Sequence, residues 1–106
     1  MQASAKLQAY VGFSIKSRHI VYGYDNVMGS GRVCLVLAAD SINRTAKKEL
    51  TQHCGERHVP LHWCDEELLQ QCVHRMGCKC IGLTDASLGH AADVELTRMR
   101  REELHE

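Results

Sequence analysis

RVCLVLAAD, residues 32–40, is the stretch that sets the architecture of this chain. Its apolar side chains run without alternation from Val33 to Ala39, which is typical of a strand that helices cover on both faces. Asp40 and Ser41 then provide two candidates for a helix N-cap. The stretch therefore predicts a buried strand over 32–39 that leads directly into a helix.

The helix after this strand is expected to continue to about Arg57. Small and apolar residues recur in it every fourth position, which places them on one face of a helix. The expected inward residues are Ile42, Ala46, Leu50 and Cys54. On the outside, Arg44, Lys47 and Lys48 have the spacing of one exposed helix face.

Working outward from this unit, apolar runs of strand length alternate with amphipathic stretches of helix length. The helix over 65–76 is expected to bury Met76 and to end at Gly77. The expected order is helix 2–17, strand 19–22, short helix 24–28, strand 32–39, helix to 57, strand 59–63, helix 65–76, strand 78–84 and helix 87–104. This alternation predicts an α/β protein, a three-layer α/β/α sandwich with a small, mostly parallel four-stranded sheet.

The bulk properties fit one domain over residues 1–106 with no membrane span. Thirteen basic and thirteen acidic side chains give a formal net charge of zero, so the chain lacks the overall positive charge of most non-specific nucleic-acid binders. No signal-peptide pattern is present, so we expect a cytoplasmic location and reduced thiols rather than disulfides for the six cysteines.

Polar residues follow three of the expected strands. They lie in the segments 22–26, 39–41 and 84–87. Ligands of open α/β sheets bind at the carboxyl ends of the strands, and parallel strands would bring all three segments to one edge. Arg44, Lys47 and Lys48 lie early in the next helix, where the helix dipole disfavours cations, so they suggest a nearby polyanion. An ordinary solvated surface, partly balanced by nearby acids, explains the same three residues.

These blocks, in this order, resemble the ribosomal protein family that binds kink-turn RNA, including its archaeal-type and eukaryotic-type large-subunit members and small bacterial paralogues. The resemblance extends from about Leu7 to Leu96. It rests on VYGYDNV, RVCLVLAAD, NRTAKKELTQHCGERHVPLHW, DEELLQQC and CIGLTD. The sequence departs from the family at Gly29, where members usually carry a lysine.

The resemblance implies a single RNA-binding α/β domain, associated with ribonucleoprotein and recognising structured, kink-turn-like RNA such as ribosomal RNA. It also implies that RNA contacts the glycine turn, the adjoining helix start and the loop after the last strand. By position, these are Gly23, Tyr24, Asp25, Asn26, Thr84, Asp85 and Ala86. The basic residues Arg44, Lys47 and Lys48 would then lie near the phosphate backbone. No cofactor, metal or catalytic residue is implied.

Two other interpretations fit the sequence. A diverged scaffold or adaptor of the same fold would bind a protein partner through its neutral surface. A zinc site is the other, because cysteines and histidines gather in two places, and zinc prefers these ligands. They are His53, Cys54, His58, His62, Cys64, Cys78 and Cys80. No C-x2-C pair supports zinc, and no P-loop, dinucleotide or G-x-S-x-G motif indicates an enzyme.

Overall fold

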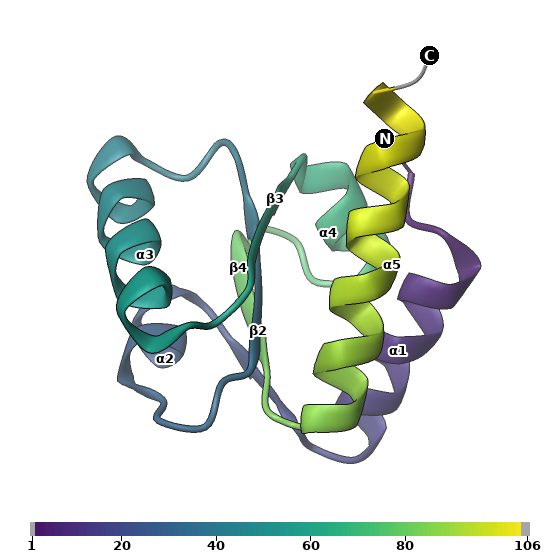
Figure 1. Ribbon diagram of the computed structural model, residues 1–106, viewed down its shortest axis with the longest axis horizontal. Helices are drawn as coiled ribbons and strands as arrows, with labels where there is room; N and C mark the ends of the chain where they lie inside the picture. The colour runs from purple at the N-terminus through teal and green to yellow at the C-terminus, as the bar shows by residue number, and fades with distance from the viewer. Residues whose placement is uncertain (1, 105–106) are drawn as a thin grey trace.

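The computed structural model of the protein describes residues 2–104 and shows a four-stranded sheet between two layers of helices (Figure 1). Helices α2 and α3 cover one face of the sheet, and α1, α4 and α5 cover the other. In chain order the elements are α1 (Ala5–Lys16), β1 (Ile20–Tyr22), α2 (Tyr24–Gly29), β2 (Leu35–Ala39), α3 (Arg44–Arg57), β3 (Leu61–Cys64), α4 (Glu66–Val73), β4 (Cys80–Leu83) and α5 (Ala86–Leu104). The three-layer α/β arrangement expected from the sequence is confirmed.

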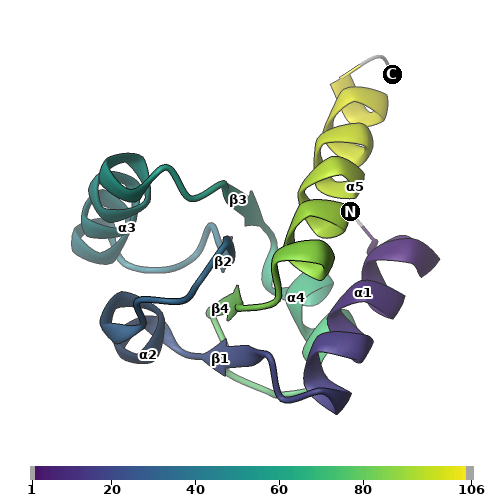
Figure 2. The same cartoon turned by 60° about the horizontal axis from the view of Figure 1, so that its bottom comes forward.

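The direction of one strand differs from the expectation. The strands lie in the order β1-β4-β2-β3 (Figure 2), and β4 runs antiparallel to both of its neighbours. Within residues 2–104, β2 and β3 are the one pair of strands that runs parallel. The prediction of a mostly parallel sheet is therefore wrong, and the sheet is mixed.

The path through α4 explains this reversal. Cys64, at the end of β3, pairs with Ala39, and Cys80, at the start of β4, pairs with Ala38. The chain therefore leaves β3 and enters β4 at the same edge of the sheet. A parallel crossover instead returns the chain to the opposite edge before the next strand begins. We call the edge that holds Tyr22, Ala39 and Cys64 the carboxyl edge.

Each face of the sheet has its own apolar core. Every residue of the central strands β2 and β4 is buried, as the unbroken apolar run of β2 predicts, whereas the edge strands are partly exposed. On the α2/α3 face, Ile42, just before α3, and the predicted inward residues of α3 itself are all buried: Ala46, Leu50 and Cys54. A side chain at Gly82 would meet Val33 at 2.9 Å, so glycine allows the close packing here.

Several helix ends differ from their predicted positions, and α1 begins at Ala5 rather than at residue 2. Asn43, rather than Asp40 or Ser41, caps α3, because its side chain accepts a hydrogen bond from the backbone N–H of Ala46 at 2.9 Å. Helix α4 ends at Val73, one turn earlier than expected, and His74 adopts the left-handed conformation after it. Met76 consequently lies in the loop and is 93% exposed, so its predicted burial is wrong.

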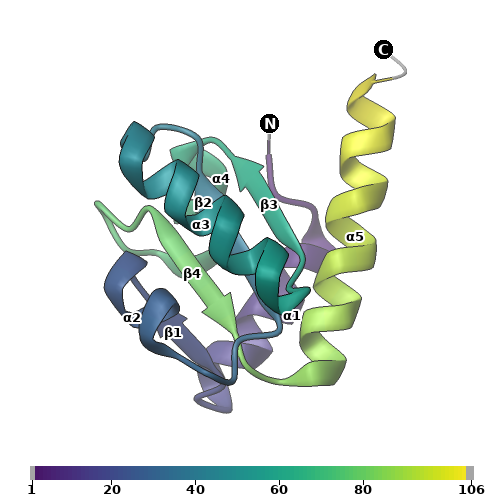
Figure 3. The ribbon, with the colours of Figure 1, turned by 60° about the vertical axis from the view of Figure 1, so that its left-hand side comes forward.

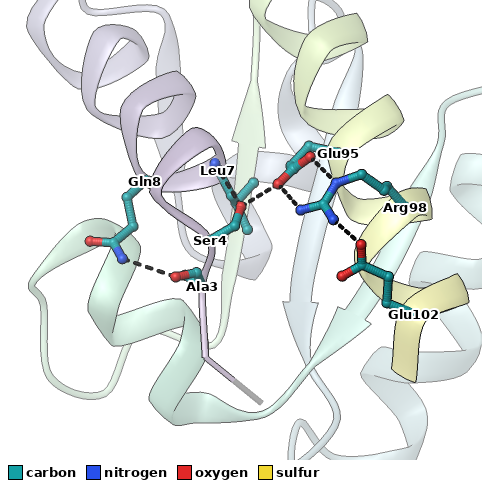
Figure 4. Close-up of polar contacts among 7 residues, drawn as sticks. All are labelled: Ala3, Ser4, Leu7, Gln8, Glu95, Arg98 and Glu102. Carbon is teal, nitrogen blue, oxygen red and sulfur yellow. Dashed lines mark hydrogen bonds and ion pairs between the residues drawn. The ribbon is translucent and has the colours of Figure 1, made fainter. Parts of the chain in front are cut away.

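A polar network joins the two ends of the chain on the other face (Figure 4). Ser4 caps α1 by accepting a hydrogen bond from Leu7 and donates one to the buried carboxylate of Glu95 on α5. Arg98 holds the same carboxylate, with its Nη2 2.6 Å from Oε2, and also pairs with Glu102. The first turn of α1 is thereby fixed to the middle of α5. No helix within residues 2–104 is long and apolar enough to cross a bilayer.

Candidate nucleic-acid interface

The glycine turn, residues 23–26, joins β1 to α2 at the carboxyl edge. Gly23 has φ of 90° and ψ of 152°, which a residue with a side chain adopts only with strain. Its N–H donates to the carbonyl oxygen of Cys80 at 2.8 Å, so the turn is attached to the start of β4. Asp25 and Asn26 are exposed. The turn therefore presents two polar side chains from a fixed backbone.

The side chains of this turn do not serve as its helix cap. Gly23 occupies the N-cap position and makes no side-chain capping bond. Asn26 instead donates through Nδ2 to the carbonyl oxygen of Tyr22 at 2.8 Å. This bond fixes the orientation of the amide and turns it back toward β1. Neither Asp25 nor Asn26 therefore acts as the N-cap of α2.

The loop between α4 and β4, residues 74–79, lies beside the glycine turn. The guanidinium carbon of Arg75 is 3.8 Å from the centre of the Tyr22 ring, a cation–π contact. His74 and Gly77 both have positive φ and shape this loop so that Arg75 and Met76 are exposed. Arg75 also borders an open hollow of about 580 Å³ that Asp25, Asn26 and the strand β1 line.

Sequence reasoning missed Arg75 because its position depends on the direction of β4. An antiparallel β4 begins next to the end of β1, so the loop before β4 reaches the glycine turn. A parallel β4 would have put the loop after β4 there instead. An arginine and a methionine close to a glycine in LLQQCVHRMG were the only local signal. We call residues 23–26 together with Arg75 and Met76 the turn surface.

The loop after β4 lies at the opposite edge of the sheet. The N–H of Thr84 donates to the carbonyl oxygen of His19, at the start of β1, at 2.9 Å. Asp85 caps α5 by accepting from the N–H of Leu88 at 2.8 Å, and Ala86 is the first residue of that helix. The expectation that Thr84, Asp85 and Ala86 share one edge with Gly23 is therefore wrong.

Helix α3 presents its basic residues away from the glycine turn. Glu49 accepts a hydrogen bond from the hydroxyl of Tyr24, so this flank of α3 faces α2. Lys47 lies about 200° around the helix from Glu49, and its Nζ is 5.7 Å from the centre of the Trp63 ring on β3. The structure thus separates Arg44, Lys47 and Lys48 from the turn surface, although Figure 3 shows α2 and α3 on the same face.

The bond between Tyr24 and Glu49 also changes the titration of the phenol. The hydrogen bond to the Glu49 carboxylate raises the pKa of Tyr24 to about 12, with smaller contributions from burial and nearby negative charge. Tyr24 is therefore a neutral hydrogen-bond donor well above neutral pH. Its hydroxyl connects α2 to α3 and helps to position the start of the glycine turn.

The cysteines and histidines that suggested zinc are dispersed. Among the residues that the structure describes, no three histidine, cysteine or acidic side chains are placed to share a metal ion. Burial raises the pKa of the Cys64 and Cys80 thiols to about 12 and that of Cys72 to about 11, so all three are protonated at neutral pH. His62 contacts Asp93 instead, with 2.7 Å between Nε2 and Oδ1.

The fold resembles solved structures of low sequence identity. The sequence matches no protein-family model and no curated protein sequence. A protein of unknown function from Bacillus halodurans superposes with a TM-score of 0.81 at 21% identity, over 89% of this chain and 99% of that one. The 15.5kD RNA binding protein of Giardia lamblia superposes with a TM-score of 0.68 at 15% identity, over 94% of this chain and 92% of that one. At these identities, the similarity establishes a shared fold.

Proposed function

We propose that this protein binds structured RNA through the turn surface and acts as a binding protein rather than an enzyme. The observation that carries the proposal is the contact of Arg75 with Tyr22, which places a cation and an exposed Met76 beside the glycine turn. The Giardia lamblia protein, which has this fold, is an RNA binding protein. That likeness supports the same class of ligand here.

The chemistry of the turn surface suits RNA whose bases are unpaired or unusually paired. Arginine pairs with phosphate or stacks on a base, and an exposed apolar side chain can cover a base that has left its helix. The exposed Asp25 carboxylate accepts hydrogen bonds from base amino groups and repels phosphates. A continuous duplex has no unpaired base for these side chains to contact. We therefore propose kink-turn-like RNA, as found in ribonucleoprotein particles, as the preferred ligand.

A titration with labelled RNA tests this proposal. Fluorescence anisotropy would compare a kink-turn hairpin with a fully paired duplex of the same length. We expect tighter binding to the hairpin and weaker binding as salt rises from about 50 to about 200 mM, because phosphate contacts release counterions. Equal binding to both RNAs, or no binding to either, would contradict the proposal.

Variants locate the binding surface in the same assay. Arg75→Ala is expected to weaken hairpin binding about tenfold, the loss of one charge-assisted contact. Lys16→Ala is the matched control, because Lys16 is an exposed cation in the last turn of α1 and does not line the hollow that Arg75 borders. If both variants bind like the unmodified protein, RNA does not use the turn surface.

A further inference from the structure

A second concave surface lies between α3 and the edge strand β3, on the same face of the sheet as α2. It is an open groove of about 600 Å³, and we call it the Trp63 groove. Its lining residues are Arg44, Lys47, Lys48, Thr51, Gln52 and Trp63. Trp63 contributes a partly exposed ring, and the other five residues all come from α3.

Within residues 2–104, the cations of the Trp63 groove form no ion pair. The ion pairs of residues 2–104 involve His62, Lys79 and Arg98, and none includes Arg44, Lys47 or Lys48. Glu49, the acid adjacent to them in the sequence, bonds to Tyr24 on the other flank of α3. Three cations outside these ion pairs, beside one aromatic ring, suit an anionic ligand with a flat, apolar part.

We propose that the Trp63 groove binds a single-stranded segment flanking the structured RNA, an inference that rests on the proposed function. Aromatic rings that stack bases, combined with cations that follow the phosphates, are the usual means of binding single strands. A base that stacks on Trp63 displaces the Lys47 ammonium from the ring. The ammonium then pairs with the adjoining phosphate, while Arg44 and Lys48 hold its neighbours.

The position of the groove allows one RNA to occupy both surfaces. Trp63 and Tyr22 both lie near the carboxyl edge, on strands at the two ends of the sheet order, with Trp63 on the α2/α3 face and Tyr22 on the opposite face. Three strand spacings of roughly 4.8 Å separate these strands, about 14 Å in all. An RNA that occupies both surfaces therefore passes over the carboxyl edge. An acidic peptide would also neutralise the cations, but it brings no ring to stack on Trp63, so the groove favours RNA.

Trp63 reports directly on occupation of the groove, because it is the only tryptophan in the sequence. Titration with a short single-stranded oligouridylate should quench its fluorescence, and rising salt should weaken the binding. The double variant Lys47→Ala, Lys48→Ala should bind about tenfold more weakly, whereas Lys16→Ala should bind normally. Quenching by an acidic oligoglutamate peptide but not by the oligonucleotide would overturn the proposal in favour of a protein partner.

A second comparison separates this inference from the proposed function. The kink-turn hairpin is titrated with and without a single-stranded extension, and the extension should tighten binding about tenfold through one stacked base and its phosphates. Trp63→Leu and the double lysine variant should each abolish that gain while binding of the bare hairpin stays unchanged. If the hairpin binds but the extension does not tighten its binding, the inference about the Trp63 groove is overturned and the proposed function stands. If the hairpin does not bind but the oligouridylate still does, the structured-RNA proposal is overturned. The Trp63 groove then remains a binding site for single strands.

Discussion

Gly89 lies so close to Cys34 that a methyl group at position 89 would sit 2.6 Å from the cysteine sulfur. The sulfur has little room to retreat, because the single thiol hydrogen of Cys34 is shared between the carbonyl oxygens of Leu83 and Asp85, which lie 3.1 and 3.2 Å from the sulfur. The start of α5 can therefore approach the beginning of β2 only with glycine at this position.

Gly89→Ala should destabilise the protein by about 1 to 3 kcal/mol, the usual cost of overpacking, although alanine is the better helix former. Gly12→Ala is the matched control, because Gly12 lies inside α1 and a methyl group there would meet no atom within 4 Å. We expect that control to raise the unfolding free energy by about 0.5 to 1 kcal/mol. Urea unfolding of both variants measures the difference. If both changes stabilised the protein equally, the Cys34 side chain would have to move aside at little cost in free energy.

His58→Gly should stabilise the protein. His58 follows α3 in the left-handed conformation, with φ of 56°, and such a backbone costs a residue with a side chain about 1 to 2 kcal/mol. Glycine avoids most of that strain, so we expect a gain of up to about 1 kcal/mol in urea unfolding. Gln52→Gly, on the exposed surface inside α3, should instead cost about 1 kcal/mol. A loss of stability in both variants would contradict the prediction.

Glu95 should make folding sensitive to acid. Hydrogen bonds from Arg98, and then from Ser4, lower the pKa of the Glu95 carboxyl to about 2, against 4.5 for an unperturbed glutamate. A carboxyl whose pKa is lower in the folded state stabilises the protein fully above pH 4.5 and loses that contribution as the pH falls toward 2. The Glu95→Gln variant should therefore be less stable than the unmodified protein at pH 7.

Unfolding measured across this acid range checks the effect of Glu95. The difference between Glu95→Gln and the unmodified protein should shrink steadily below pH 4.5. Glu102→Gln removes another partner of Arg98, but one that is exposed, so it should change stability much less. A difference for Glu95→Gln that is the same at all pH values would mean that the carboxylate charge contributes nothing.

Tyr24 should ionise later than a free tyrosine. Its pKa of about 12 exceeds the ordinary value of 10, so its hydrogen bond stabilises the fold fully below pH 10 and is lost as the pH rises toward 12. An alkaline titration followed by tyrosinate absorbance should show a late component among the three tyrosines, and Tyr24→Phe should remove it. Glu49→Gln should move that component toward pH 10. A late component that persists in Tyr24→Phe would assign it to another tyrosine.

The fold could be predicted largely from local apolar patterns. The unbroken apolar run before Asp40 is typical of a central strand, and the four-residue recurrence from Ile42 to Cys54 gives the inner face of α3. Such patterns state how deeply a segment is buried, but they are the same for a strand running in either direction. These patterns therefore could not predict that β4 runs antiparallel to its neighbours.

The candidate site depended on that strand direction and was only partly predicted. Gly23 was found because a glycine between a strand and a helix is a local signal, and its positive φ accounts for it. Arg75 and Tyr22 are far apart in the sequence and meet only because β4 starts beside the end of β1. Trp63 is half-buried because β3 is an edge strand. Long-range strand pairing determines where Arg75, Tyr22 and Trp63 lie.

The central place of β4 has a consequence for how the chain acquires its structure during synthesis. In the sheet, β1 pairs with β4 alone, and β4 also separates β1 from β2. While a ribosome has released only the segment before Cys80, β1 has no neighbour to pair with, and β2 and β3 form an isolated parallel pair. Such non-local pairing slows folding. β1 therefore joins the sheet only after β4 has emerged and has inserted between β1 and β2.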